Sequence, residues 1–357
     1  MNLTTNELIN LKYMMKVISI ATWLMLLILA GCSDASPSAE EPSAQERTIT
    51  LNLDITTKTT APVEESPDNF HLWIFNGDNL LKYIGTNPDW EEIYSGGIDL
   101  KATIKTEIDA TGITEIQFYL LLNVPEGKII NANDMTPNSL KALTFTLPEK
   151  PYSHDNKVPM SGKVTLDIFP SQLHYDVRID ATRCVAKLAI YCTKSSKESD
   201  LTIHKVTLNS IPDKGALFNF NIAPADISYS GGKELLSSDK VIKTAYTELS
   251  LPTDTDGSWS EEVEQQFTNI STSYLLENLD GGDNLQINGI VNDNRYYVTL
   301  EYTLNGIVYT QIIYLPQMLR NQFRKIYIRI NDAITVEDIY CQINSWTTHE
   351  MDVPAFE

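Results

Sequence analysis

The sequence lacks the short motifs that mark the common enzyme and nucleotide-binding classes. It has no glycine-rich phosphate loop and no nucleophile elbow, so the usual nucleotide-binding and hydrolase folds lack their first element. Its five histidines are scattered, with no His-Glu-x-x-His motif and no cysteine pair at zinc-finger spacing. Acidic pairs such as Glu91-Glu92 are typical of a solvated surface rather than of a glycosidase acid and base. We therefore expect no catalytic site, no metal site and no cofactor, and we expect the protein not to be an enzyme.

Positive charge is also scarce. The chain has 27 Lys and Arg against 47 Asp and Glu, which gives a formal net charge of -20 at pH 7. An acidic surface repels both a phosphate backbone and anionic lipid headgroups. Nucleic acid is therefore excluded as an expected partner.

Cysteine is rare too. Apart from Cys32, the chain has Cys184, Cys192 and Cys341, an odd number that leaves at least one thiol unpaired within the chain. Cys184 and Cys192 lie in one expected strand, Tyr175 to Cys192, roughly 26 Å apart and beyond the reach of a disulfide. We expect buried free thiols, and a bridge from either residue to Cys341 stays open as the alternative.

The start of the chain has the pattern of a bacterial lipoprotein signal. Met14-Met15-Lys16 precedes an apolar run from Val17 to Ala30, which ends in Leu29-Ala30-Gly31-Cys32. The run is shorter than the roughly 20 apolar residues that span a membrane. We predict a signal peptide over residues 1–31, lipid on Cys32, and an acidic disordered tether over residues 32–47.

From Thr48 onward the sequence consists of short alternating runs separated by turn residues. In Thr48–Thr56, the apolar residues Ile49, Leu51, Leu53 and Ile55 alternate with polar ones, which predicts a half-buried strand. A Thr136 cap followed by Pro137 predicts a short helix, and Asn305-Gly306 predicts a tight hairpin. The other expected strands are Phe70–Phe75, Ile113–Leu122, Leu143–Leu147, Gly162–Phe169, Tyr175–Cys192, Leu201–Asn209, Thr272–Leu279, Tyr296–Leu304, Ile307–Leu315, Arg324–Asn331 and Asp338–Trp346.

Many strands and few helices predict an all-β fold with two tandem β-sandwich domains. We expect an N-terminal domain over residues 48–176, a C-terminal domain over residues 177–346, and a tail over residues 347–357.

Several segments follow one another in a recognisable order and spacing: Leu29–Cys32, Thr48–Thr56 with Thr57-Lys58-Thr59, Phe70–Gly77, Phe118–Pro125, Val158–Gly162, Ala181–Leu188, Tyr274–Asn278, Leu319–Phe323 and Trp346. Together they resemble the fimbrillins of Bacteroidales, the type V pilins. The resemblance implies transthyretin-like sandwich domains, export as a lipoprotein to the outer membrane, and trimming by a protease. It also implies assembly with other fimbrial subunits by strand exchange.

The resemblance implies a maturation cut after the first strand, where the family usually has an arginine. Here Lys58 stands at that position, and Arg47 is the only arginine nearby. Both are candidate cleavage residues, although Lys58 is equally well explained as an exposed turn residue. An untrimmed chain would instead match the anchor subunits of the family.

Apolar residues are spaced through otherwise polar sequence at the C-terminal end: Ile343, Trp346, Met351, Val353 and Phe356. They are candidate donor-strand residues for a neighbouring subunit, or they form a last strand and tail that pack on their own domain. We expect a structural or adhesive subunit of a cell-surface fimbrium. The alternatives are a fimbrial anchor, or a surface lipoprotein that binds a host glycan or protein without polymerising.

Overall fold

The computed structural model describes residues 46–58, 66–94, 98–153, 156–218, 226–236, 238–248, 261–282, 285–287, 293–331 and 336–345. The expected signal peptide, most of the tether and the tail lie outside these residues. So do Cys32, Trp346, Met351, Val353 and Phe356, as do the side chains of Lys58 and Ile343. Residues from Arg47 onward form one compact unit.

The described residues are mainly β-strand, which confirms the expected all-β class. The first strands are β1 (Thr48–Lys58), β2 (Phe70–Asn76), β3 (Asn79–Ile84), β4 (Glu91–Tyr94), β5 (Ile98–Asp109), β6 (Glu115–Leu122), β7 (Thr144–Phe145), β8 (Met160–Asp167) and β9 (His174–Arg183). The later strands are β10 (Val185–Lys194), β11 (Leu201–Asn209), β12 (Ile211–Pro212), β13 (Gly215–Ala216), β14 (Tyr229–Ser230), β15 (Lys233–Leu236), β16 (Lys240–Val241), β17 (Thr268–Leu276), β18 (Gln286–Ile287), β19 (Tyr297–Leu304), β20 (Ile307–Tyr314), β21 (Gln322–Ile330) and β22 (Val336–Ser345). The described helices are η2 (Ala132–Asp134), α2 (Pro137–Lys141) and α3 (Glu261–Glu264).

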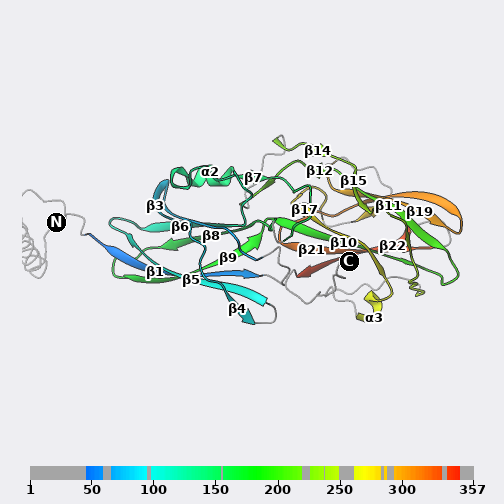
Figure 1. Ribbon diagram of the computed structural model, residues 1–357, viewed down its shortest axis with the longest axis horizontal. Coiled ribbons are helices and arrows are strands. Elements are labelled where there is room, and N and C mark those ends of the chain that lie inside the picture. The colour runs from blue at the N-terminus through cyan, green and yellow to red at the C-terminus, as the bar shows by residue number, and fades with distance from the viewer. Residues whose placement is uncertain are drawn as a thin grey trace, which may run out of the picture. The chain divides into compact units, whose positions relative to one another are not determined.

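The strands up to β9, apart from β7, form a sheet of order β3-β2-β6-β8-β9-β1-β5-β4 that folds into two layers (Figure 1). The layers join where Met160 and Ser161 of β8 pair with Arg183 and Thr182 of β9, and β8 and β9 pair at no other position. Apolar side chains from both layers meet in one core. Its members include Leu51 of β1, Leu72 of β2, Phe118 of β6 and Val177 of β9. This arrangement is a β-sandwich.

A second sandwich is built from the strands that follow. A sheet of order β17-β10-β21-β22 packs on a sheet of order β15-β11-β19-β20-β18. The core between them includes Leu188 and Ile328 from the first sheet and Val206 and Leu300 from the second. The Asn305-Gly306 hairpin is confirmed, since it joins β19 to β20 and both residues have positive φ, 50° and 83°.

A third apolar cluster combines side chains from both sandwiches. It contains Trp73 and Tyr119 from β2 and β6, Leu140 of α2, and Val185 and Phe323 from β10 and β21. Helix α2 begins as expected. Thr136 caps it, Pro137 is its first residue, and Thr136 and Ser139 bond each other's backbone N–H in a capping box. Because β10 and β21 face cores on both sides, nearly all of their residues are buried.

The expected single strand Tyr175–Cys192 is wrong. It divides at Cys184 into β9, which pairs with β1, and β10, which pairs with β17 and β21. The backbone N–H of Cys184 donates to the Pro159 carbonyl at 2.8 Å, outside the strand pairing of either sheet. The expected domain boundary at residues 176 and 177 therefore falls inside β9. The division into two domains stays a prediction, and we now place its boundary at Cys184, where sheet membership changes.

Two further differences concern local sequence. The expected strand Leu143–Leu147 shortens to the two residues of β7, which pair with β13. Strands β3, β4 and β5 were not expected, although β5 alternates through Ala102, Ile104, Thr106 and Ile108. Strand β5 has the same alternation that predicts β1, and it lies between β1 and the edge strand β4.

Candidate functional site

Strand β1 is held on both sides by other strands. It pairs antiparallel with β5 from Thr48 to Lys58 and parallel with β9 from Thr50 to Thr57. Figure 1 shows β1, the first described strand, beside β5 and β9. Strand β1 is therefore an interior strand of its sheet. Its removal would leave a gap between β5 and β9, which we call the slot.

The inward face of β1 is fully buried. Ile49, Leu51, Leu53 and Ile55 are each 0% exposed, which confirms the alternation expected from the sequence. At about 1.5 to 3 kcal/mol for each side chain, their burial contributes roughly 6 to 12 kcal/mol before the cost of ordering the chain. A slot left by β1 would thus expose an apolar floor together with unpaired backbone groups of β5 and β9.

The outward face of β1 is bonded to both neighbours through polar side chains. The Asn52 amide donates to Asp176 on β9 at 2.8 Å, and the Thr56 hydroxyl donates to Asp180 on the same strand. On the other side, Asp54 lies 3.0 Å from the Lys101 ammonium of β5. This row of contacts could not be predicted from the sequence, because β5 was not expected and Asn52 and Asp176 are far apart along the chain.

Asp54 has two partners on β5. Besides Lys101, it accepts a hydrogen bond from the Thr103 hydroxyl at 3.0 Å. The hydrogen bond from Lys101 is the main cause that holds the pKa of Asp54 below its ordinary value, and the charge of Arg178 on β9 acts in the same direction. The carboxylate therefore lies between cations on both flanking strands.

The two candidate cleavage residues lie at opposite ends of β1. Arg47 precedes the strand, and its guanidinium donates to the carbonyls of Phe169 and Gln172, the second at 2.5 Å. Its backbone N–H donates to Thr111 Oγ1 at 2.9 Å, and its carbonyl accepts from the Ala110 N–H at 2.7 Å. Lys58 is the last residue of β1. A cut after Arg47 would leave β1 in place, whereas a cut after Lys58 would separate it from β2.

Of the five candidate donor residues, the described part of the chain contains only Ile343. It lies in β22, at the edge of its sheet, and pairs with Arg324 of β21. Strand β22 belongs to its own sandwich, and the donor role of Ile343 and of the four later residues stays a prediction.

The three described cysteines are free, with Cys184 and Cys192 buried. Burial raises the pKa of the Cys184 thiol to about 11, and it raises the pKa of Cys192 as well. The Cys184 thiol donates to the Leu217 carbonyl at 3.0 Å. These cysteines are inert packing residues, as expected, and the alternative bridge to Cys341 is not formed.

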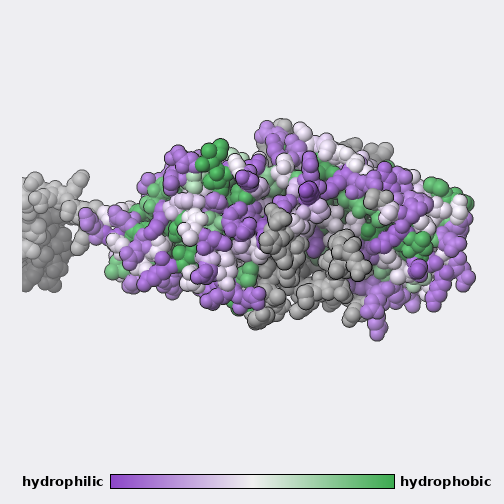
Figure 2. Space-filling view, in the orientation of Figure 1, coloured by the Kyte–Doolittle hydropathy of each residue, from purple (hydrophilic) through white to green (hydrophobic). Residues whose placement is uncertain are grey.

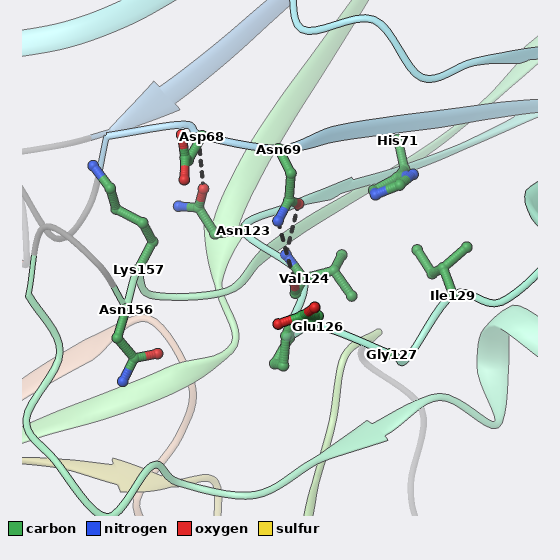
Figure 3. Close-up of a pocket in the computed structure, with 11 residues that line it drawn as sticks. Asp68, Asn69, His71, Asn123, Val124, Glu126, Gly127, Ile129, Asn156 and Lys157 are labelled. Atoms are coloured by element: carbon green, nitrogen blue, oxygen red, sulfur yellow. Dashed lines mark hydrogen bonds between the residues drawn. The ribbon is translucent and has the colours of Figure 1, made fainter.

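A polar cleft of about 370 Å³ lies where the chain before β2, the loop after β6 and the chain before β8 meet (Figure 3). Asn123, at a φ of 54°, joins these segments by accepting from the Asp68 N–H and donating to the Val158 carbonyl. Glu126 and His71 line the cleft, and burial lowers the pKa of His71. The lining offers both donors and acceptors, which suits a polar ligand.

The visible face is mostly hydrophilic, with apolar residues in scattered patches (Figure 2). Among the described residues, no group of three or more His, Cys, Asp and Glu side chains is arranged to hold a metal ion. Within the same residues, no helix is long and apolar enough to cross a membrane.

No protein-family model and no curated protein matches the chain. Solved structures do match. The tip fimbrial protein Mfa3 of Porphyromonas gingivalis, solved with a C-terminal truncation, is 15% identical at a TM-score of 0.50, over 83% of this chain and 98% of that one. A candidate cell adhesion protein of Bacteroides eggerthii is 12% identical at a TM-score of 0.50, over 84% of this chain and 95% of that one. The chain therefore has the fold of these proteins, and the expected resemblance is confirmed at the level of fold.

Proposed function

We propose that the protein is a subunit of a cell-surface fimbrium, exported as a lipoprotein and assembled by strand exchange. The observation that carries the proposal is the position of β1, an interior strand whose four inward side chains are completely buried. The shared fold with a tip fimbrial protein supports it. The partners are then other fimbrial subunits, and the location is the outer membrane and the fimbrium that extends from it.

Release of β1 provides the driving force for assembly. A subunit without β1 has unpaired backbone groups on β5 and β9 above an apolar floor, and an extended segment from a neighbour satisfies both. The donor segment of one subunit differs from the slot of the next, so the contact is heterologous and repeats into a filament.

The two candidate cleavage residues make the proposal testable. Because only a cut after Lys58 frees β1, Lys58→Ala should give folded monomers and few filaments, whereas Arg47→Ala should polymerise normally. Lys150→Ala, which removes an exposed lysine outside the strands, is the matched control and should also polymerise. Electron microscopy of the cell surface, with the protein level checked by immunoblot, gives the readout.

Normal filaments from Lys58→Ala would show that cleavage at this residue does not gate assembly. Loss of filaments in all three variants, including the control, would show a general defect rather than a block of β1 release. The first result would contradict the proposed maturation step.

A second candidate function is a surface lipoprotein that binds a host glycan or protein without polymerising. The observation that favours it is the polar cleft whose lining includes Asp68, Glu126 and Lys157. Glu126→Ala should then reduce binding of the soluble chain to host cells without changing its melting temperature. Unchanged binding would remove this support.

A further inference from the structure

We infer that the strand which replaces β1 presents a carboxylate in the place of Asp54 and hydrogen-bond donors in the places of Asn52 and Thr56. The inference rests on the proposed function, because it specifies the partner of the slot that β1 would leave. It concerns the outward side chains of the incoming strand, because the apolar floor selects only the inward ones.

The neighbours of Asp54 on β5 and β9 favour a negative charge at its position. Lys101 and Thr103 of β5 both bond the carboxylate, each at 3.0 Å. Arg178 lies directly opposite Asp54 on β9. With β1 gone, two cations from opposite rims face the same position, and an incoming lysine or arginine there would meet like charges.

The places on either side favour uncharged donors, because each lies between an acid of β9 and a lysine of β5: Lys105 lies opposite Asn52, and Lys101 lies opposite Thr56. Asp176 lies opposite Asn52 and accepts its amide N–H, and Asp180 lies opposite Thr56 and accepts its hydroxyl. Along one rim of the slot, β9 therefore presents an acid, a base and an acid at successive outward positions: Asp176, Arg178 and Asp180.

This alternation fixes the register of the incoming strand. A shift by one residue turns its apolar side chains outward and is excluded by the floor alone. A shift by two residues keeps the apolar side chains inward but moves the carboxylate between Asp176 and Lys105, or between Asp180 and Lys101, where an acid and a cation offset each other instead of both favouring it. The apolar floor cannot tell these registers apart, whereas the charges on the rim can.

The partner is thus an extended segment of a different fimbrial subunit, because the tail of this chain has Asp352 between Met351 and Val353 but has Glu350 and Pro354 where the donors are required. Its inward residues are apolar, and its three central outward residues are a donor, an acid and a donor. Strand β1 itself has this pattern in Asn52, Asp54 and Thr56, with Leu53 and Ile55 between them.

The test uses the full chain with a site for an added protease placed between Lys58 and Ser66. The cleaved chain is unfolded in urea and refolded with a large, equal excess of two peptides, Thr48–Lys58 and the same peptide with Asp54→Lys. Native mass spectrometry measures which peptide the folded chain contains. A third peptide, Thr50→Lys, is the matched control, because Thr50 lies opposite Glu107 and His174.

We expect about tenfold less incorporation of the Asp54→Lys peptide, from two lost pairs and new repulsion, and a change of less than about threefold for Thr50→Lys. In a chain carrying Lys101→Glu and Arg178→Glu, the preference should reverse in favour of Asp54→Lys. Equal incorporation in the original chain, or no reversal in the exchanged one, would overturn the inference while leaving strand replacement intact. If no peptide enters either chain, the slot does not accept a strand, and the proposed function fails together with the inference.

Discussion

Glu277 and Arg320 form a nearly enclosed ion pair that holds a third segment of the chain. The Glu277 carboxylate accepts from Arg320 Nε at 3.0 Å and Nη2 at 2.9 Å, and the two side chains are 17% and 8% exposed. The guanidinium also donates to the carbonyls of Ala216 and Leu217, at 3.0 and 3.2 Å. Ala216 belongs to β13, whose partner is β7, so this one arginine ties the second sandwich to a strand that pairs with the first part of the chain.

Arg320→Ala should therefore be strongly destabilising. It removes both guanidinium hydrogen bonds to the Glu277 carboxylate and those to the Ala216 and Leu217 carbonyls, in a site that admits little water. The N–H of residue 320 still donates to Glu277, and the Cys184 thiol still donates to Leu217. The expected loss is about 3 to 5 kcal/mol in the free energy of unfolding, measured by urea denaturation. The control is Arg178→Ala, whose partner Asp180 lies in a well-exposed pair, and it should cost no more than about 1 kcal/mol. Equal losses for the two variants would contradict the structural role of Arg320.

Asp54 gives a pH dependence with a definite sign. Its folded-state pKa is lowered, first by the hydrogen bond from Lys101, so its contribution to stability is present above its ordinary pKa and is lost as pH falls through the lowered value. The melting temperature of the unaltered protein should exceed that of Asp54→Asn at pH 7, and the difference should shrink below about pH 4. A difference that stays constant down to pH 2 would show that the Asp54 charge does not hold β1.

The local pattern of the sequence was sufficient to predict some elements. The four alternating apolar residues from Ile49 to Ile55 predict β1, Thr136 with Pro137 predicts α2, and Asn305-Gly306 predicts the β19–β20 hairpin. Each of these signals is complete within about ten residues, and the structure confirms all three.

Other features depend on contacts that no local pattern encodes. The parallel pairing of β1 with β9 joins Thr50 to His174, and the cleft joins Asp68 to Asn123 and Lys157. The sequence around Thr50 or around Asp68 does not specify these distant partners. The continuous alternation from Tyr175 to Cys192 conceals a change of sheet, since a strand leaving one sandwich and entering another keeps the same period of two.

Cys32→Ala tests the membrane attachment. If the lipobox is the only anchor, the variant should be released from the membrane or remain unprocessed with its signal peptide attached. Two or more acyl chains anchor stably where one is marginal, so the loss of attachment should be complete. The measurement is detergent-phase partitioning together with the mass of the protein. A processed variant that still partitions with detergent would refute the lipoprotein assignment.

Deletion of residues 347–357 tests the C-terminal donor. If the tail fills the slot of a neighbouring subunit, the deletion should leave the melting temperature of the monomer unchanged and abolish filaments. Replacing Met351, Val353 and Phe356 together with serine keeps the length of the tail and should give the same result. A monomer destabilised by several kcal/mol whose filaments still form would show that the tail packs on its own domain.

Release of β1 is tested most directly by the N-terminus of the protein in assembled filaments. Filaments sheared from cells and digested for mass spectrometry should begin at Thr59, the residue after Lys58, with no peptide from residues 48–58 covalently attached. A filament subunit that still begins at lipidated Cys32, or that begins at Thr48 with β1 in place, would contradict strand exchange at this slot.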